Sequence, residues 1–249
     1  MQSIEVERAG APYLFRYRPN NENTLKEIEK NYIYFANNKQ LNDPFDAHHK
    51  MLELPNNREE IQTFFSLVLD ESPIETREYL KRRFLSNPGE FFDLVNNGTE
   101  AFMSRFGIAC FTMSQINVML WATYANNHQG LCIQYNCDLD KTFFNGIRVV
   151  DYVDKFEKTS VNSGNGFTDP FFKKLKLWRN EYELRLIKEV SGEHQYDPLA
   201  ARSIILGLRS SEEFKEKVTK IIRDKQSHIK LYSSSVLPDS YGLTLTEIQ

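Results

Sequence analysis

The chain is poor in cysteine, and it lacks both standard types of glycine-rich phosphate loop. Its three cysteines, Cys110, Cys132 and Cys137, form an odd set without Cys-x-x-Cys spacing or paired-ligand spacing. Cys110 and Cys132 lie in apolar stretches, where a thiol behaves as a small hydrophobic side chain. We therefore expect three reduced thiols and no structural metal site.

The chain also lacks a long apolar run and a strong net charge. No apolar segment approaches the roughly 18 residues needed to cross a bilayer, and residues 1–10 contain acids without an apolar signal core. A net charge of -3 and a pI near 6.0 argue against a surface coated with phosphate-binding charge, although nucleic acid stays open as a substrate. We expect a cytoplasmic protein with no membrane partner. These features do not indicate an oligomeric state.

Apolar and aromatic residues are abundant. Hydrophobic residues make up 41% of the 249 positions, with 18 Phe and 12 Tyr, which is ample for a buried core. Asn23 or Thr24 is expected to cap a short helix, and Ser210 and Ser211 to open another. We predict one α+β domain over residues 1–249 with a mixed or antiparallel central sheet. Its strands are expected at 13–18, 32–36, 107–112, 131–135, 178–187, 200–206, 229–232 and 241–245.

Helical periodicity replaces strand periodicity between residues 55 and 105, with breaks at Ser72-Pro73 and Asn87-Pro88-Gly89. This pattern predicts an all-helical insertion within the domain. The insertion would serve either as a lid over a site or as packing.

Residues 178–187 alternate between apolar and charged side chains. As a strand, the segment would place Trp178, Tyr182, Leu184 and Leu186 on one face. The other face would carry Arg179, Glu181, Glu183 and Arg185. Such a charged row is either a solvated sheet face or the acidic wall of a cleft.

Arg16 and Arg18 share one face of the strand predicted at 13–18. Two arginines on an interior strand need anions beside them, because an unpaired buried charge is costly. Either protein carboxylates such as Glu181 or Glu183, or the phosphates of a ligand, would meet this need.

Trp121, Tyr124 and His128 lie at positions i, i+3 and i+7 of a helix predicted from Val118 to Gly130. An aromatic stripe at this spacing is typical of a core. All three side chains have polar tips, however, and these require hydrogen-bond partners that an apolar core does not supply. The stripe therefore belongs either to the core or to a functional site.

The turn at residues 42–46 is followed by two histidines. Asn42, Asp43 and Pro44 favour tight backbone geometry on their own. A metal site formed by Asp43, Asp46, His48 and His49 is the alternative to local hydrogen bonding.

Four ordered segments together resemble the bacterial family designated domain of unknown function 2971, over nearly the whole chain. The segments are Phe15-Arg16-Tyr17-Arg18, the Tyr34-Phe35 and Asn42-Asp43-Pro44-Phe45 pair, Trp-x-x-Tyr-x-x-x-His-x-Gly at 121–130, and Trp-x-x-Glu-x-Glu-x-Arg at 178–185. That resemblance implies a family but no activity.

The arrangement is more distantly similar to ADP-ribosyltransferases, which implies a split central sheet and NAD as substrate. Arg16 or Arg18 would then hold the pyrophosphate or ribose, and Tyr34, Trp121 or Tyr124 would stack on nicotinamide. Glu183, or else Glu181, would bind the ribose hydroxyl. Relatives commonly carry a serine where this chain has Ala36. We add His128 to the candidate catalytic residues, and Asp43 and Arg185 to the candidate NAD contacts.

Three functions follow as hypotheses. The first is an enzyme that transfers ADP-ribose from NAD to a protein or nucleic-acid acceptor, or that hydrolyses NAD, in the role of a toxin or antiviral defence effector. The second is a nuclease in which Asp43, Asp46, Glu181 or Glu183 hold magnesium. The third is a non-catalytic sensor or interaction module whose charged strand pairs internally. The first requires the early arginines and the later glutamates to line one solvent-reachable hollow.

Overall fold

The computed structural model describes residues 13–68, 73–164 and 166–248; the other positions of the predicted 1–249 domain lie outside this part. The chain divides into two compact units. The first, here the sheet unit, takes in the described residues up to Phe35, Ile108–Val150, and those from Leu177 onward. The second, here the helical unit, takes in Ala36–Gly107 and Asp151–Lys176.

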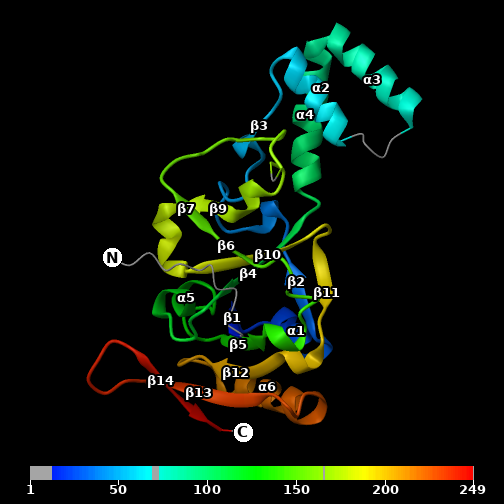
Figure 1. The fold of residues 1–249 in the computed structure, drawn as a ribbon. Coiled ribbons are helices and arrows are strands. Elements are labelled where there is room, and N and C mark those ends of the chain that lie inside the picture. The colour runs from blue at the N-terminus through cyan, green and yellow to red at the C-terminus, as the bar shows by residue number, and fades with distance from the viewer. Residues whose placement is uncertain (1–12, 69–72, 165, 249) are drawn as a thin grey trace. The chain divides into compact units, whose positions relative to one another are not determined.

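An eight-stranded sheet forms the centre of the sheet unit, in the order β14-β13-β12-β5-β1-β4-β10-β6 (Figure 1). Strands β12 and β13 are parallel, and the pairs β1/β5, β1/β4, β5/β12, β6/β10 and β13/β14 are antiparallel. The predicted α+β class with a mixed sheet is confirmed. The strands are β1 (Tyr13–Arg18), β4 (Gly107–Thr112), β5 (Leu131–Asn136), β6 (Arg148–Val149), β10 (Glu183–Lys188), β12 (Ala201–Leu206), β13 (Lys230–Val236) and β14 (Leu243–Glu247).

Helices α1 (Glu22–Lys30) and α6 (Glu212–Lys225) cover one face of this sheet, here the α1 face. Leu25 of α1 and Val218 of α6 share a core cluster with Leu14 of β1. Ser211 caps α6 as predicted, its hydroxyl accepting from the backbone of Phe214. Helix α1 begins earlier than predicted, because the extended Asn21 accepts from the Thr24 amide and is itself the cap.

Helix α5 (Val118–Thr123) covers the opposite face, here the α5 face. Its Leu120 and Trp121 pack with Phe15, Tyr17 and the free thiol of Cys132. The rest of the sheet unit is a small antiparallel pair of β2 (Tyr32–Phe35) and β11 (Gly192–Gln195), with short 3-10 helices η3 (Cys137–Leu139), η5 (Lys176–Glu181) and η6 (Pro198–Ala200).

The helical unit contains α2 (Arg58–Val68), α3 (Ile74–Ser86) and α4 (Pro88–Met103), where the sequence predicts helices. Phe64, Phe65, Phe84 and Phe91 form its aromatic core, with ring centroids 5.5 to 6.0 Å apart. No helix in the described ranges has the length and apolarity that crossing a membrane requires. The unit also contains β3 (Leu52–Glu53) with β8 (Thr159–Ser160), β7 (Asp151–Val153) with β9 (Lys173–Leu175), and the 3-10 helices η1 (Asn38–Gln40), η2 (His49–Met51) and η4 (Asp169–Phe172).

Candidate functional site

Strand β1 places its aromatic and cationic side chains on opposite faces of the sheet. Tyr17 lies on the α5 face, where its ring meets Trp121 edge-on with 5.0 Å between centroids. Arg16 lies on the α1 face, with its guanidinium carbon 6.0 Å from the centre of the Phe111 ring. Because side chains alternate along a strand, Arg18 points the same way as Arg16. The structure therefore separates the arginine pair from Trp121.

Glu27 of α1 supplies the anion for both arginines. Its side chain is 3% exposed, with Oε2 2.5 Å from Arg18 Nε and Oε1 3.7 Å from Arg16 Nη2. Arg16 Nη2 also donates to the carbonyl oxygen of Tyr34 at 2.8 Å. Burial and the positive charge of Arg16 lower the pKa of Arg18, and Glu27 opposes that shift. The anion is thus a protein carboxylate, but it comes from α1 and not from residues 178–187.

Residues 178–187 do not form one continuous strand, contrary to the prediction. The 3-10 helix η5 ends at Glu181, Tyr182 follows with a φ of 48°, and β10 begins at Glu183. A positive φ is unfavourable for an aromatic residue and breaks the regular alternation of a strand. The Tyr182 ring is consequently exposed, whereas Leu184 keeps its predicted place in the core.

Glu181 is buried at the end of η5 and is bound to Tyr124, so the structure brings two of the predicted site residues together. Glu181 Oε1 accepts the phenolic hydroxyl at 2.7 Å, a length typical of a hydrogen bond to a charged group. The same segment is tied to the start of α5, because the Asn117 side chain donates to the Asn180 carbonyl at 2.8 Å. The Tyr17 hydroxyl accepts from the Asn117 amide at 3.1 Å, and burial raises the pKa of Tyr17.

Glu183 and Arg185 form a buried two-point ion pair on β10. Arg185 Nε lies 2.6 Å from Glu183 Oε1, and Arg185 Nη2 lies 3.1 Å from Oε2. The side chains are 0% and 3% exposed for Arg185 and Glu183. Residues two apart in a strand share a face, and Leu184 between them points into the core of the α1 face. Glu183 and Arg185 therefore lie on the α5 face, opposite Arg16 and Arg18.

The predicted helix from Val118 to Gly130 ends at Thr123. Asn126, Asn127 and His128 follow with φ values of 47°, 54° and 67°. Three successive left-handed residues end an α-helix, and Asn and His tolerate this conformation better than most residues. His128 therefore does not reach the position i+7 of a helix.

His128 still contacts Trp121, because the left-handed turn folds it back against α5. Their rings stack with 6.0 Å between centroids and an angle of 11°. His128 Nδ1 is buried and has no hydrogen-bond partner among the residues that the structure describes. Burial and the nearby positive charge of Arg209 lower the pKa of His128.

Asp43 and Asp46 belong to the helical unit, where Asp43 makes a local hydrogen bond and Asp46 lies near a lysine that is distant in sequence. Asp43 Oδ1 accepts from the Phe45 amide at 2.9 Å, and Asp46 Oδ2 lies 3.8 Å from the buried ammonium of Lys174. His48 Nδ1 accepts from the Lys50 amide and so caps η2. Within the ranges that the structure describes, no three His, Cys, Asp or Glu side chains are placed to hold a metal ion. The alternative of an Asp/His metal site at Asp43, Asp46, His48 and His49 therefore has no ligand set among the residues that the structure describes.

Sequence reasoning missed Glu27, the residue that completes the arginine cluster. The sequence does contain a signal for Glu27, because this acid lies beside Leu25 and Ile28 in the apolar stripe of α1. An acid within the buried stripe of a helix predicts a cationic partner. The strand just before this helix carries two arginines.

The sheet unit thus holds charged groups on opposite faces, so the early arginines and the later glutamates do not line one hollow, which the NAD hypothesis from the sequence required. The cluster of Arg16, Arg18 and Glu27 lies on the α1 face. Two pairs, Tyr124 with Glu181 and Glu183 with Arg185, lie on the α5 face and are together called the glutamate site here. Comparison with known proteins finds no matching family model, no matching curated protein and no matching solved structure.

Proposed function

We propose that the protein breaks the bond between nicotinamide and ribose in NAD and passes ADP-ribose to water or to a protein or nucleic-acid acceptor. Glu181 and Glu183 carry the proposal, as two buried carboxylates separated by one residue at the α5 face. Cleavage of glycosidic bonds commonly relies on a pair of carboxylates. The same proposal includes two further points. The sheet is a split sheet like that of ADP-ribosyltransferases, and the chain belongs to the family designated domain of unknown function 2971.

Glu183 takes the electrostatic role in this reaction. When the bond from ribose C1′ to the nicotinamide nitrogen breaks, its electron pair leaves with nicotinamide and positive charge develops on the ribose. A fixed carboxylate beside that charge stabilises it without having to reorganise. Arg185 supports this role, because its two contacts hold the Glu183 carboxylate in one orientation.

Glu181 takes the role of base. Water or an acceptor hydroxyl forms the new bond to C1′ and releases a proton, which a carboxylate can accept. Tyr124 donates to Glu181 Oε1, and the carboxylate of Glu181 is the group that the proposal assigns to this proton. Tyr124 is half-buried, and it is the aromatic residue that the proposal assigns to nicotinamide, because Trp121 is fully buried.

The other predicted site residues have no NAD contact in this proposal, which therefore rests on the glutamates without the arginines that the sequence-based hypothesis required beside them. Arg16, Arg18 and Tyr34 lie in the Glu27 cluster on the α1 face, where they join β1, α1 and β2. Asp43 lies in the helical unit. An enzyme that consumes NAD in this way would act in the cell as a toxin or as an antiviral defence effector.

The test is incubation of the pure chain with NAD labelled in its adenylate half, alone and with protein or nucleic-acid acceptors. Labelled free ADP-ribose would identify hydrolysis, and label on an acceptor would identify transfer. Neither product, together with no NAD binding by calorimetry, would overturn the proposal.

A non-catalytic interaction module is the second candidate, and the Glu183–Arg185 pair favours it. Each charge in that pair is buried and satisfied by the other. Replacing a buried ion pair by apolar residues of similar volume is often neutral or stabilising. If the Glu183→Met/Arg185→Met variant folds and behaves like the wild type in cells, the result supports the module. If it folds but does not behave like the wild type in cells, the result supports the enzyme.

A further inference from the structure

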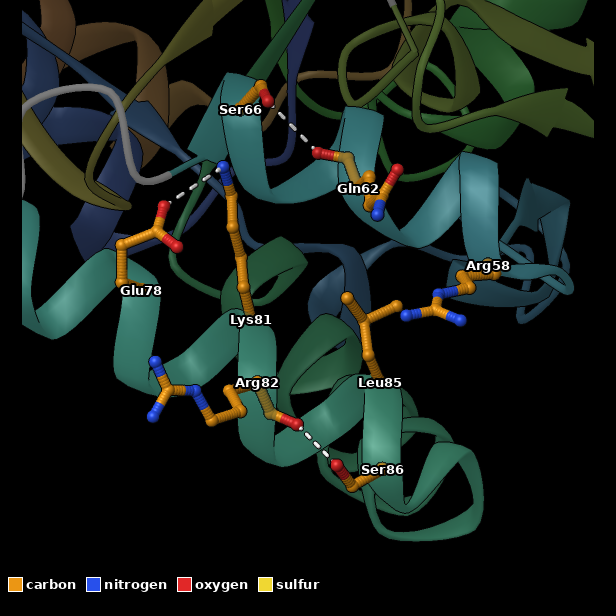
Figure 2. Close-up of a pocket in the computed structure, with 8 residues that line it drawn as sticks. All are labelled: Arg58, Gln62, Ser66, Glu78, Lys81, Arg82, Leu85 and Ser86. Carbon is orange, nitrogen blue, oxygen red and sulfur yellow. Dashed lines mark hydrogen bonds and ion pairs between the residues drawn. The ribbon is translucent and has the colours of Figure 1, made fainter.

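A cavity of about 530 Å³ lies between α2 and α3 in the helical unit (Figure 2). Its volume falls within the range of small-molecule sites, roughly 300 to 1,000 Å³. Three cations, one acid and a single aliphatic side chain contribute to its wall. The lining residues are Arg58, Gln62, Ser66, Glu78, Lys81, Arg82, Leu85 and Ser86.

The cations of this cavity are not balanced by the acid. Among the lining residues that the structure describes, three positive side chains and one negative side chain leave an excess of two positive charges. Neither Arg58 nor Arg82 forms an ion pair with any residue in the described part of the chain. Glu78 stands four residues before Arg82, a spacing that favours pairing, yet it contacts Lys81 at 3.8 Å. An anion in the cavity would offset this repulsion.

The polar groups of the wall favour an anion over a cation or a neutral ring. Arg58 comes from α2, and Lys81 and Arg82 come from α3, so cations approach from both helices (Figure 2). The Ser66 and Ser86 hydroxyls donate to carbonyl oxygens within their own helices, at 3.0 and 2.8 Å. The donors left for a ligand are therefore chiefly the cations, and guanidinium groups match phosphate oxygens in geometry.

Leu85 is the one aliphatic side chain among the described lining residues, which limits the apolar part of the ligand. We propose that the cavity between α2 and α3 binds a compact phosphate-bearing small molecule, with Arg58, Lys81 and Arg82 as its donors. This site lies in the helical unit, and the proposal does not depend on the glutamate site or on NAD chemistry.

Inorganic pyrophosphate is the probe, titrated into the full chain by calorimetry at low and at physiological salt. The test variants are Arg58→Gln and Arg82→Gln. Arg83→Gln is the matched control, because Arg83 neighbours Arg82 on α3 but pairs with Glu90 and does not line the cavity. We expect saturable binding that weakens about tenfold or more in each test variant and changes less than about twofold in the control.

Thermal melting of each variant shows whether it remains folded, and these surface changes should leave the melting temperature nearly unchanged. Equal weakening in all three variants would overturn the proposal, because it would indicate general attraction to a basic surface. Absence of saturable pyrophosphate binding would also overturn it. So would binding of a single-stranded oligonucleotide without binding of pyrophosphate, since that result would assign the cations to a nucleic-acid surface.

Discussion

The phenolic oxygen of Tyr124 lies 2.7 Å from Oε1 of Glu181, which joins the residue after α5 to the end of η5 across 57 positions of sequence. Tyr124→Phe removes this donor and keeps the ring. Because hydrogen bonds to charged groups contribute about 1.5 to 3 kcal/mol, we expect the free energy of unfolding to fall by about 1 to 2 kcal/mol at this half-buried position. Urea denaturation measures the change, and Tyr241→Phe at a fully exposed ring is the control. Equal losses in the two variants would contradict the assigned bond.

Glu27→Gln should destabilise the fold strongly. The change leaves the buried Arg16 and the partly exposed Arg18 without a counter-charge, and removing one partner of a buried pair costs about 3 to 5 kcal/mol. Glu22→Gln is the control on the same helix, since Glu22 is exposed and contacts Lys217 at 3.5 Å. Denaturant unfolding compares the two. A loss below about 1 kcal/mol in Glu27→Gln would show that the cluster does not depend on Glu27.

Two glycines permit close backbone contacts beside the left-handed turn. A Cβ on Gly130 would lie 2.0 Å from the Arg18 carbonyl oxygen, and a Cβ on Gly207 would lie 2.2 Å from that of His128. Both obstacles are backbone atoms, so Gly130→Ala and Gly207→Ala should each destabilise by about 1 to 3 kcal/mol or more. Gly98→Ala in α4 is the contrast, because no atom lies within 4 Å of its added Cβ. We expect that change to stabilise by about 0.5 to 1 kcal/mol. If Gly98→Ala were less stable than Gly130→Ala and Gly207→Ala, the result would contradict these contacts.

His128 should make the stability of the fold depend on pH. Burial and the charge of Arg209 lower the pKa of His128 in the folded chain, so below about pH 6.5 the unfolded chain binds more protons. The stability due to the neutral imidazole is therefore present above that pH and is lost as the pH falls through the folded pKa. His128→Asn keeps a residue suited to the φ of 67° and removes the titration. Unfolding between pH 5 and 7.5 should show a smaller pH dependence in His128→Asn than in the wild type; equal slopes would contradict the assignment.

Local patterns predicted the sheet well, because strict alternation and capping residues determine short elements. The alternation in residues 13–18 predicts β1, and Ser211 predicts the start of α6. The strand predicted at 131–135 is β5, and the class with a mixed sheet is confirmed.

Backbone conformations with positive φ limited the prediction elsewhere. Propensity alone does not show that Asn126, Asn127 and His128 turn left-handed after α5, although the two asparagines were compatible with it. Tyr182 gives no such signal, since an aromatic residue rarely adopts its φ of 48°. These two sites account for the helix and the strand that were predicted too long.

The candidate site was predicted by residue type but not by partner. Tyr124 and Glu181 do meet at the α5 face, where Glu183 also lies. The cation beside Glu183 is Arg185, two residues away, whereas Arg16 and Arg18 face α1 and pair with Glu27. Pairing across the fold depends on which face each strand presents to which helix, and sequence spacing within a strand does not specify this.

The most direct test of the central claim is the initial rate of nicotinamide release from NAD by the wild type and by Glu183→Gln, measured side by side. Loss of a group that stabilises developing charge should slow release by roughly 100-fold or more. Glu189→Gln, at an exposed position just after β10, should match the wild type. No release by the wild type above a protein-free blank, or equal rates for the wild type and Glu183→Gln, would contradict the claim.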